Sequence, residues 1–431
     1  MSATGTDKPG NASEPADRWI LIAAGLLALA PWIVYHRLFA RLYWFGDEFD
    51  LIDQIERLGL WRWMWLVFAE NFVPLFKLLW GGGVLVFGGS YASMVAAVWL
   101  THALNVVLLG RLMRTCGFSW AAVFIAQATF GLTPANMETL AWTVQGSAVL
   151  SVTFMLLALD CFFRRPFGRA PLAWGAASAL SFSRGVLTGA MLALACLWHR
   201  GGGPRQSLSR RAALALAYLS PAVLVGVLIT VMASGNHQHM KGHGGEAAVF
   251  ALWYYCLNPS YLVFAVESWG WRTVSILGLC KVALVSWAIL RSRGDQRLLV
   301  VLMVAFDLGN AALLGIGRYH TGLAATVSSR YQYASLLGVV PAAGFWLSSQ
   351  WGRLPGPAAA RRAAFAALLC VAAVAMCRQW SADLDNFTAT RGSESRRLLL
   401  VDKVPYPNLV PGIPWLPMDR AKALIAKYNL H

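Results

Sequence analysis

The sequence predicts an all-α, polytopic membrane protein with about 11 transmembrane helices. Of its 431 residues, 58% are hydrophobic and only 13% are charged, which is more apolar surface than a soluble core can bury. Apolar runs of about 20 residues, the length that crosses roughly 30 Å of hydrocarbon, recur between short polar breaks. Because lipid tolerates no unpaired backbone groups and the runs are too long for barrel strands, we expect the spans to be helices.

The elements follow in order from the N-terminus. Residues 1–17 are polar and rich in Ser, Gly, Pro and Ala, which predicts a disordered tail. A helical membrane domain then covers residues 18–380, and its first span carries no signal-peptide cleavage site. Between 170 and 198 two short apolar segments meet at Ser183, Arg184 and Gly185, which predicts a hairpin of two short helices. The other spans are expected at 19–39, 91–110, 118–134, 139–163, 211–233, 273–290, 298–316, 330–349 and 363–380.

Charge predicts the orientation of these spans. Basic residues close to a span resist translocation, so loops rich in Arg stay cytoplasmic. We therefore interpret the net charge of +16 as a topology signal in a cytoplasmic (inner) membrane and expect no nucleic-acid partner. The N-terminus is then cytoplasmic, and residues 381–431 form a short extracytoplasmic cap. The basic loops contain Arg111, Arg114, Arg164, Arg165, Arg169, Arg200, Arg205, Arg210, Arg211, Arg291, Arg293, Arg297, Arg353, Arg361 and Arg362.

The first external loop, residues 41–90, carries a compact acidic cluster of Asp47, Glu48 and Asp50. The cluster opens the segment GDEFDLIDQIERLGLWRW, whose apolar and polar residues separate onto two faces of an amphipathic surface helix. Asp47 and Asp50 share one helical face, whereas Glu48 points elsewhere. These acids either stabilise the positive end of the helix dipole, or one of them takes a proton from an acceptor hydroxyl while its neighbour tunes the pKa or helps to hold a divalent metal.

The order of elements across about residues 19–165 resembles the GT-C superfamily of polytopic glycosyltransferases. After the acids, NFVPLFKLLWGGGVLVFGG predicts an interfacial helix, and a span containing His102 and Asn105 follows. The later segments TPANMETLAWTVQGSAVL and SSRYQY are similar to a second external turn and to a Ser-Arg-Tyr signature of that superfamily. The resemblance implies transfer of a sugar from a polyprenyl-phosphate donor on the outer face, generally with inversion, and it implies that Asp47 is the catalytic base.

A lipid-phosphate donor requires cations near the outer membrane surface, and Arg binds phosphate with two parallel hydrogen bonds. Arg318 and Arg330 flank an outward loop, with Tyr331 beside them. Simple snorkelling to the interface is the alternative for each arginine. Where the superfamily often has Lys-Glu at a break in the fifth helix region, this chain has Ser183-Arg184, and the resemblance implies that Arg184 takes the place of the lysine at the lipid phosphate.

Two further segments contain candidate site residues. The Gly-rich loop ASGNHQHMKGHGGE carries His237, His239 and Lys241, and it is interpreted as a flap that closes over substrate, a zinc site or an inert loop. Glu138 either caps the next helix or faces the same cavity as Asp47. Asp307 is an acid inside a predicted span, so we expect a partner for it, either Asn310 or a residue of a neighbouring helix.

The sequence therefore favours a membrane hexosyl- or pentosyltransferase that uses a polyprenyl-phosphate-linked sugar and a glycan, lipid or protein acceptor. Two alternatives stay open: a transporter or flippase without catalysis, and an assembly partner in cell-surface polysaccharide export. Acids concentrated in one outer loop and the lack of a clear internal repeat favour an interfacial reaction over transport. The residues do not indicate which sugar or which acceptor is used.

Overall fold

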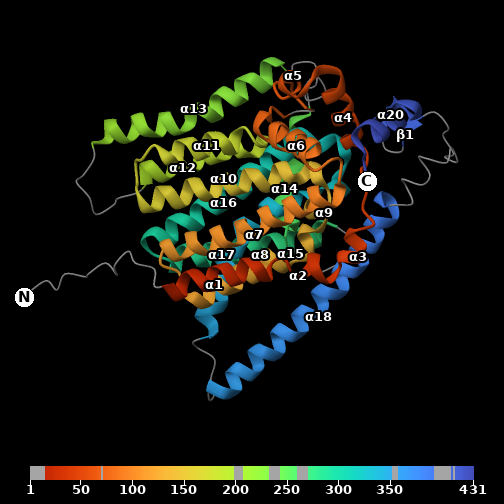
Figure 1. The fold of residues 1–431 in the computed structure, drawn as a ribbon. Coiled ribbons are helices and arrows are strands. Elements are labelled where there is room, and N and C mark those ends of the chain that lie inside the picture. The colour runs from red at the N-terminus through yellow and green to blue at the C-terminus, as the bar shows by residue number, and fades with distance from the viewer. Residues whose placement is uncertain are drawn as a thin grey trace, which may run out of the picture.

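The computed structural model describes residues 15–68, 71–198, 207–232, 243–259, 270–351, 358–392, 409–410 and 413–431. Its membrane domain is helical, and an antiparallel pair of strands lies near the C-terminus (Figure 1). These strands are β1 (Leu409–Val410) and β2 (Ile413–Pro417).

The first predicted span is helical with two interruptions. It consists of α1 (Pro15–Leu27), α2 (Ala30–Val34) and α3 (His36–Phe39). Pro31 stands in the first turn of α2, where its missing N–H costs nothing, and this explains why a new helix begins there. The loop that follows holds three short helices: α4 (Asp47–Leu58), α5 (Leu60–Trp63) and α6 (Pro74–Val86).

The middle of the chain alternates long helices with short 3₁₀ turns. The predicted hairpin between 170 and 198 is present as two helices joined at η3, and Arg184 lies in that turn. The elements are α7 (Tyr91–Thr115), α8 (Trp120–Leu132), η1 (Pro134–Asn136), α9 (Met137–Ala141), η2 (Thr143–Gln145), α10 (Gly146–Arg164), α11 (Ala170–Ala179), η3 (Ser183–Gly185) and α12 (Val186–Trp198).

The remainder of the chain contains one helix that the sequence analysis missed. No helix was expected between 233 and 273, yet residues 244–257 form α14, which packs against α15 and α16. The elements are α13 (Leu208–Met232), α14 (Gly244–Leu257), α15 (Trp271–Arg291), α16 (Gly294–Arg318), η6 (Tyr319–Thr321), η7 (Leu323–Val327), η8 (Ser329–Tyr331), α17 (Gln332–Trp351), α18 (Ala358–Arg391) and α20 (Met418–Tyr428).

Within the described ranges, five helices are long and apolar enough to cross a membrane. Leu216, Leu224 and Leu290 on such helices are exposed, as lipid-facing side chains are. The chain is therefore a multi-pass membrane protein, as predicted. The expected total of about 11 spans is not confirmed, because α8, α11 and α12 are shorter than a full crossing requires.

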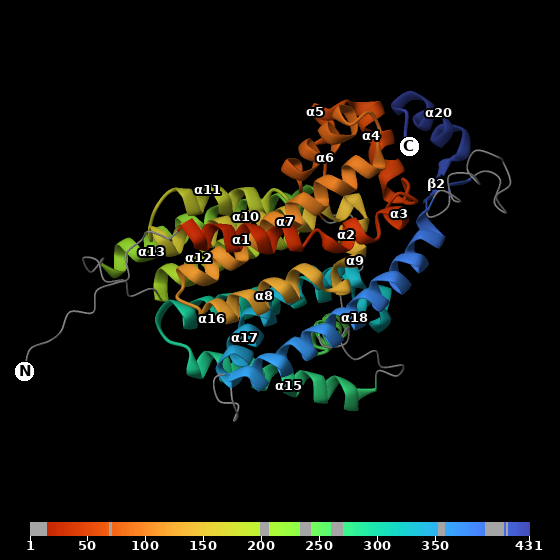
Figure 2. The same cartoon turned by 60° about the horizontal axis from the view of Figure 1, so that its bottom comes forward.

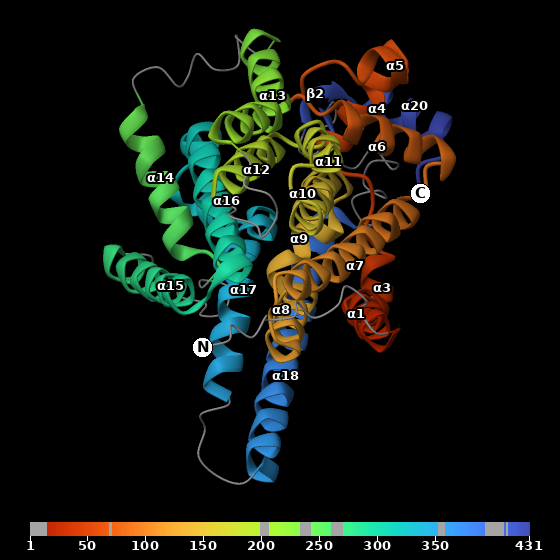
Figure 3. The same ribbon diagram turned by 90° about the vertical axis from the view of Figure 1, so that its left-hand side faces the viewer.

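The long helices lie side by side, and α4, α5, α6 and α20 gather at one end of them, which we call the acidic end (Figures 1 and 2). Figure 3 looks from the opposite end and shows α14 and α15 at the edge of the bundle. Helix α18 runs along the bundle and reaches the acidic end near Arg391, while His431 also lies there.

Helix α20 is bonded to the polar face of α4. Arg420 Nε lies 2.5 Å from Asp53 Oδ1, and Lys427 Nζ lies 2.6 Å from Glu56 Oε1. The Tyr428 hydroxyl donates to Glu56 at 2.8 Å. The opposite face of α4, which includes Leu51, is buried in the core. The C-terminal helix thus covers the amphipathic helix that begins with the acidic cluster.

Candidate active site at the acidic end

Asp47 is the first residue of α4. Gly46 precedes it with φ of 56°, a left-handed conformation that glycine adopts without strain. The Asp47 side chain is half-buried, and no described residue donates a hydrogen bond to its carboxylate. Burial and the neighbouring Asp50 raise its pKa, against the opposing effect of nearby arginines. These arginines are Arg330, Arg391 and Arg318, so the two ends of segment 319–331 and the end of α18 bring positive charge toward Asp47.

Glu48 is fully buried and lies within a network of its own. Its carboxylate accepts hydrogen bonds from the Thr143 hydroxyl and from the Phe45 backbone N–H, the latter at 2.8 Å. Burial raises the pKa of Glu48 to about 7, although both hydrogen bonds oppose the shift. Glu48 therefore connects the start of α4 to η2, and its oxygens are already engaged.

Asp50 contributes to the same end of α4. The Gln54 amide donates to Asp50 Oδ2 at 2.7 Å, and the Trp63 indole N–H donates to Gln54 at 3.1 Å. Asp50 and Asp47 are close enough for Asp50 to raise the pKa of Asp47. Of the three acids in the cluster, Asp47 is the one whose carboxylate has no hydrogen bond from the described part of the chain.

Glu138, in α9, holds the turn that contains Arg330. Its Oε2 atom accepts from the Ser328 and Ser329 hydroxyls at 3.2 and 3.3 Å and from the Arg330 backbone N–H at 3.2 Å. The Thr139 hydroxyl also donates to the Arg330 carbonyl at 3.2 Å. Glu138 thus holds η8 in place, a contact that the sequence did not indicate.

Arg391, at the end of α18, is a site residue that the sequence analysis missed. Its guanidinium lies over the rings of Phe45, Trp142 and Phe387 at 4.7, 4.2 and 4.5 Å. Its Nη2 atom is 3.9 Å from Glu138 Oε1. Burial lowers the pKa of Arg391 while Glu138 and Glu48 oppose that shift. No local pattern marks this arginine, because its partners come from the first loop and from α9.

Arg184, Arg330 and Arg391 present buried N–H groups that have no hydrogen-bond partner among the described residues, as does Arg111 at the opposite end of the bundle. Arg184 is 3% exposed, and both its Nε and Nη1 are unpaired. Arg330 Nε and Arg391 Nη1 are also buried without a hydrogen-bond partner among the described residues. The Arg184 guanidinium lies 4.7 Å from the Phe182 ring and is close enough to Tyr254 and Tyr331 to interact with them electrostatically. A buried N–H donor without an acceptor destabilises the folded protein, so such donors are expected to meet an acceptor.

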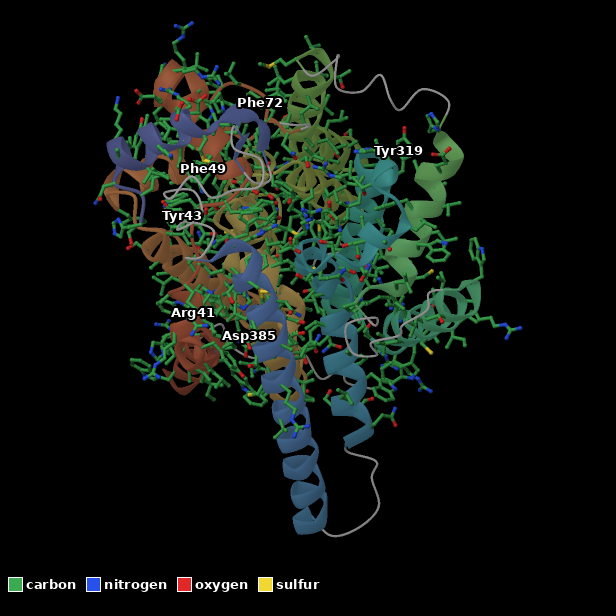
Figure 4. All side chains as sticks on the ribbon, turned by 90° about the vertical axis from the view of Figure 1, so that its right-hand side faces the viewer. Arg41, Tyr43, Phe49, Phe72, Tyr319 and Asp385 are labelled. Carbon is green, nitrogen blue, oxygen red and sulfur yellow. The ribbon has the colours of Figure 1, made fainter. Side chains whose placement is uncertain are left out.

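The remaining predicted residues are placed as follows. Tyr331 is buried beside Arg330, whose guanidinium lies 5.1 Å from its ring. Arg318 ends α16, next to Tyr319, and Figure 4, which looks onto the acidic end, shows Tyr319 at one side and Phe49 of α4 at the other. His237, His239 and Lys241 lie outside the described residues.

A metal site is not evident at the acidic end. Within the ranges that the structure describes, no group of three or more His, Cys, Asp or Glu side chains has an arrangement that could hold an ion. Asp47, Glu48 and Asp50 belong to those ranges. The site therefore offers one unbonded carboxylate surrounded by cations rather than a set of converging ligands.

Fold and site together define a multi-pass helical membrane protein with an acidic helix and several arginines at one end. No known sequence family and no characterised protein matches the chain. Among solved structures, it is similar to the archaeal oligosaccharyltransferase AglB from Archaeoglobus fulgidus, in complex with an inhibitory peptide and a dolichol-phosphate, at 12% identity and a TM-score of 0.49. The match covers 94% of this chain and 61% of AglB, so the chain spans about three fifths of that protein's length.

Proposed function

We propose that the protein is a membrane glycosyltransferase that moves a sugar from a polyprenyl-phosphate donor to a glycan, lipid or protein acceptor. One observation carries the proposal. Arg330 and Arg391 lie close enough to Asp47 to lower its pKa, and each has a buried N–H donor without a partner among the described residues, while the Asp47 carboxylate accepts no hydrogen bond from those residues. The donors suit an anion with several oxygens, and the carboxylate suits a general base. The resemblance of residues 19–165 to the GT-C superfamily supports the same reaction.

In this reaction the donor phosphate is the leaving group. Arg184 and Arg330, with Arg318 and Tyr331 beside them, bind its oxygens and stabilise the negative charge that grows as the sugar–phosphate bond breaks. Asp47 takes the proton of the acceptor hydroxyl while that oxygen forms a bond to the anomeric carbon. Attack from the side opposite the phosphate inverts the anomeric centre. The products are the glycosylated acceptor and the free polyprenyl phosphate.

The other acids support this arrangement. Glu48 holds the first turn of α4 against η2. Glu138 holds η8 and thereby fixes the backbone position of Arg330. Arg391 lies between these groups and keeps positive charge next to Asp47. Asp50 raises the pKa of Asp47 toward the range in which a carboxylate is an effective base.

We infer that the acidic end faces the extracytoplasmic side of a cytoplasmic membrane, with the N-terminus in the cytoplasm. Support comes from Arg111 and Arg164, which lie at the far ends of α7 and α10 and share Asp160 as an ion-pair partner. Basic residues concentrate at that end, as the positive-inside rule requires of a cytoplasmic face.

Binding of polyprenyl phosphate to the purified protein tests the proposal. We expect Arg330→Gln and Arg184→Gln each to weaken binding about tenfold or more, because each removes charge-assisted hydrogen bonds to phosphate. Arg293→Gln, an exposed arginine at the opposite end, is the matched control and should bind normally. Unchanged affinity in both site variants would exclude the proposed phosphate site. If the labelled polyprenyl-phosphate sugar crosses the proteoliposome membrane and no new glycosidic bond forms, the protein is instead a flippase.

A further inference from the structure

Helix α14 ends inside the helical bundle. Its 14 residues extend about 21 Å, which is too short to cross the hydrocarbon. A helix that ends away from water must have partners for its last carbonyl groups. Lys281, near the middle of α15, supplies them: its Nζ donates to the Tyr255 carbonyl at 2.8 Å and to the Asn258 carbonyl at 2.7 Å.

The charge of Lys281 is balanced within the bundle. Asp307 of α16 lies 2.6 Å from Lys281 Nζ, and both side chains are 1% exposed. Asp307 therefore has a partner on a neighbouring helix, while Asn310 bonds elsewhere. An ammonium at the C-terminal end of a helix also interacts favourably with the helix dipole. The ion pair thus anchors the inner end of α14 to both α15 and α16.

From this anchored position, α14 holds the segment 319–331 at three places. The Tyr254 hydroxyl donates to the Tyr331 carbonyl at 2.7 Å, and Asn258 Nδ2 donates to the Thr326 carbonyl at 2.8 Å. At the other end of α14, the His243 ring stacks on Tyr319 with 5.5 Å between centroids. Asn310 of α16 donates to the Tyr254 hydroxyl at 2.8 Å, which orients the phenol.

We infer that Tyr254 and Asn258 are positioning residues that set the place of Arg330, with α14 as their rigid support. The inference rests on the proposed role of Arg330 in binding the donor phosphate. It follows because η6, η7 and η8 are short 3₁₀ turns with few internal hydrogen bonds, so external bonds must fix them. Glu138 holds η8 from α9 and Tyr254 holds it from α14, which leaves the Arg330 side chain on a backbone fixed from both sides.

Tyr254→Phe tests this inference because it removes one hydroxyl and leaves the ring. Hydrogen exchange of residues 319–331 should speed up about fivefold, because the segment loses its hydrogen bond from Tyr254 to the Tyr331 carbonyl, and the affinity for polyprenyl phosphate should fall by a similar factor. Turnover at saturating donor should change less than about twofold, because Arg330 acts on binding of the donor. Tyr218→Phe is the matched control, since the Tyr218 hydroxyl donates to the Gly168 carbonyl at the opposite end.

A second variant avoids leaving a lone buried charge. Lys281→Met combined with Asp307→Asn removes both charges and frees the end of α14, and it should speed exchange in residues 319–331 as well. Unchanged exchange in this segment in Tyr254→Phe would overturn the inference, as would faster exchange with unchanged donor affinity. If the wild-type protein binds no polyprenyl phosphate, the proposed function is refuted. Faster exchange of residues 319–331 in Tyr254→Phe would then still show that α14 supports this segment.

Discussion

Individual carboxylates at the acidic end have different surroundings, and this separates their roles. Asp47 is half-buried without a described hydrogen bond, whereas Glu48 is fully buried and bonded to Thr143 and Phe45. Helical spacing in the sequence correctly separates Glu48 from the face shared by Asp47 and Asp50. The sequence does not indicate Arg391, because its position beside Asp47 depends on how α18 packs near the first loop.

The surroundings of Glu48 predict a pH-dependent stability. Because burial raises its pKa from 4.5 to about 7, the folded protein holds the proton more tightly than the unfolded chain. Its contribution to stability is complete below about pH 4.5 and is lost as the pH rises through about 7, by about 3 kcal/mol in all. Thermal denaturation in detergent at pH 5 and pH 8 should show this loss in the wild type and a smaller one in Glu48→Gln. Equal pH dependence in the two proteins would contradict the assignment.

Arg391 predicts a shift of the pH dependence of activity. Its positive charge lowers the pKa of Asp47, so Arg391→Gln should raise that pKa. A base acts when it is ionised, so the acidic limb of the profile of kcat/KM against pH should move to higher pH. Arg293→Gln should leave the profile unchanged. A shift to lower pH in Arg391→Gln would show that Arg391 does not act on the ionisation of the base.

At the scale of elements, α4 and α20 form a pair that the sequence indicates only in part. The amphipathic pattern of residues 47–58 predicts a helix with one apolar face, and α4 has that face buried. The same pattern predicts a helix that lies along the membrane surface. The structure instead bonds it to α20, through ion pairs that link residues more than 360 positions apart. Such pairing depends on tertiary packing, which local periodicity does not encode.

The pairing of α4 with α20 predicts energetic coupling between Asp53 and Arg420. Asp53 is largely buried and Arg420 Nε lies 2.5 Å from it, so the two single substitutions to Ala should not be additive. A double-mutant cycle measured by denaturation in detergent should give a coupling free energy of about 0.5–2 kcal/mol. Arg62→Ala, at an exposed arginine of α5, is the control, and it should be additive with Asp53→Ala. Additivity of Asp53→Ala and Arg420→Ala would show that this contact does not hold the cap.

For the whole molecule, composition was sufficient to predict a multi-pass helical membrane protein, because so large an apolar fraction has no other stable arrangement. Composition did not predict α14. The apolar segment that forms α14 is shorter than a membrane-spanning helix, so a search for full spans passes over it. Its inner end is stabilised by Lys281 and Asp307, which form an ion pair there. The placement of Arg330 and Arg391 beside Asp47 likewise required the packed structure.

The orientation of the whole molecule predicts accessibility from opposite sides of the membrane. In a cysteine-free form of the chain, Asn386→Cys should react with an impermeant maleimide added to intact cells, because α18 reaches the acidic end near this residue. Arg293→Cys, exposed between α15 and α16, should react only after the cells are opened. The reverse pattern would place the acidic end in the cytoplasm and contradict the proposed topology.

We propose that Asp47 is the base of a sugar transfer from a lipid phosphate. The most direct measurement is the release of polyprenyl phosphate from a labelled polyprenyl-phosphate sugar by the reconstituted protein in the presence of acceptor. We predict turnover by the wild type and by Asp385→Asn, an exposed acid on α18, and a loss of about 100-fold or more in Asp47→Asn with donor binding retained. Full turnover by Asp47→Asn would contradict the claim.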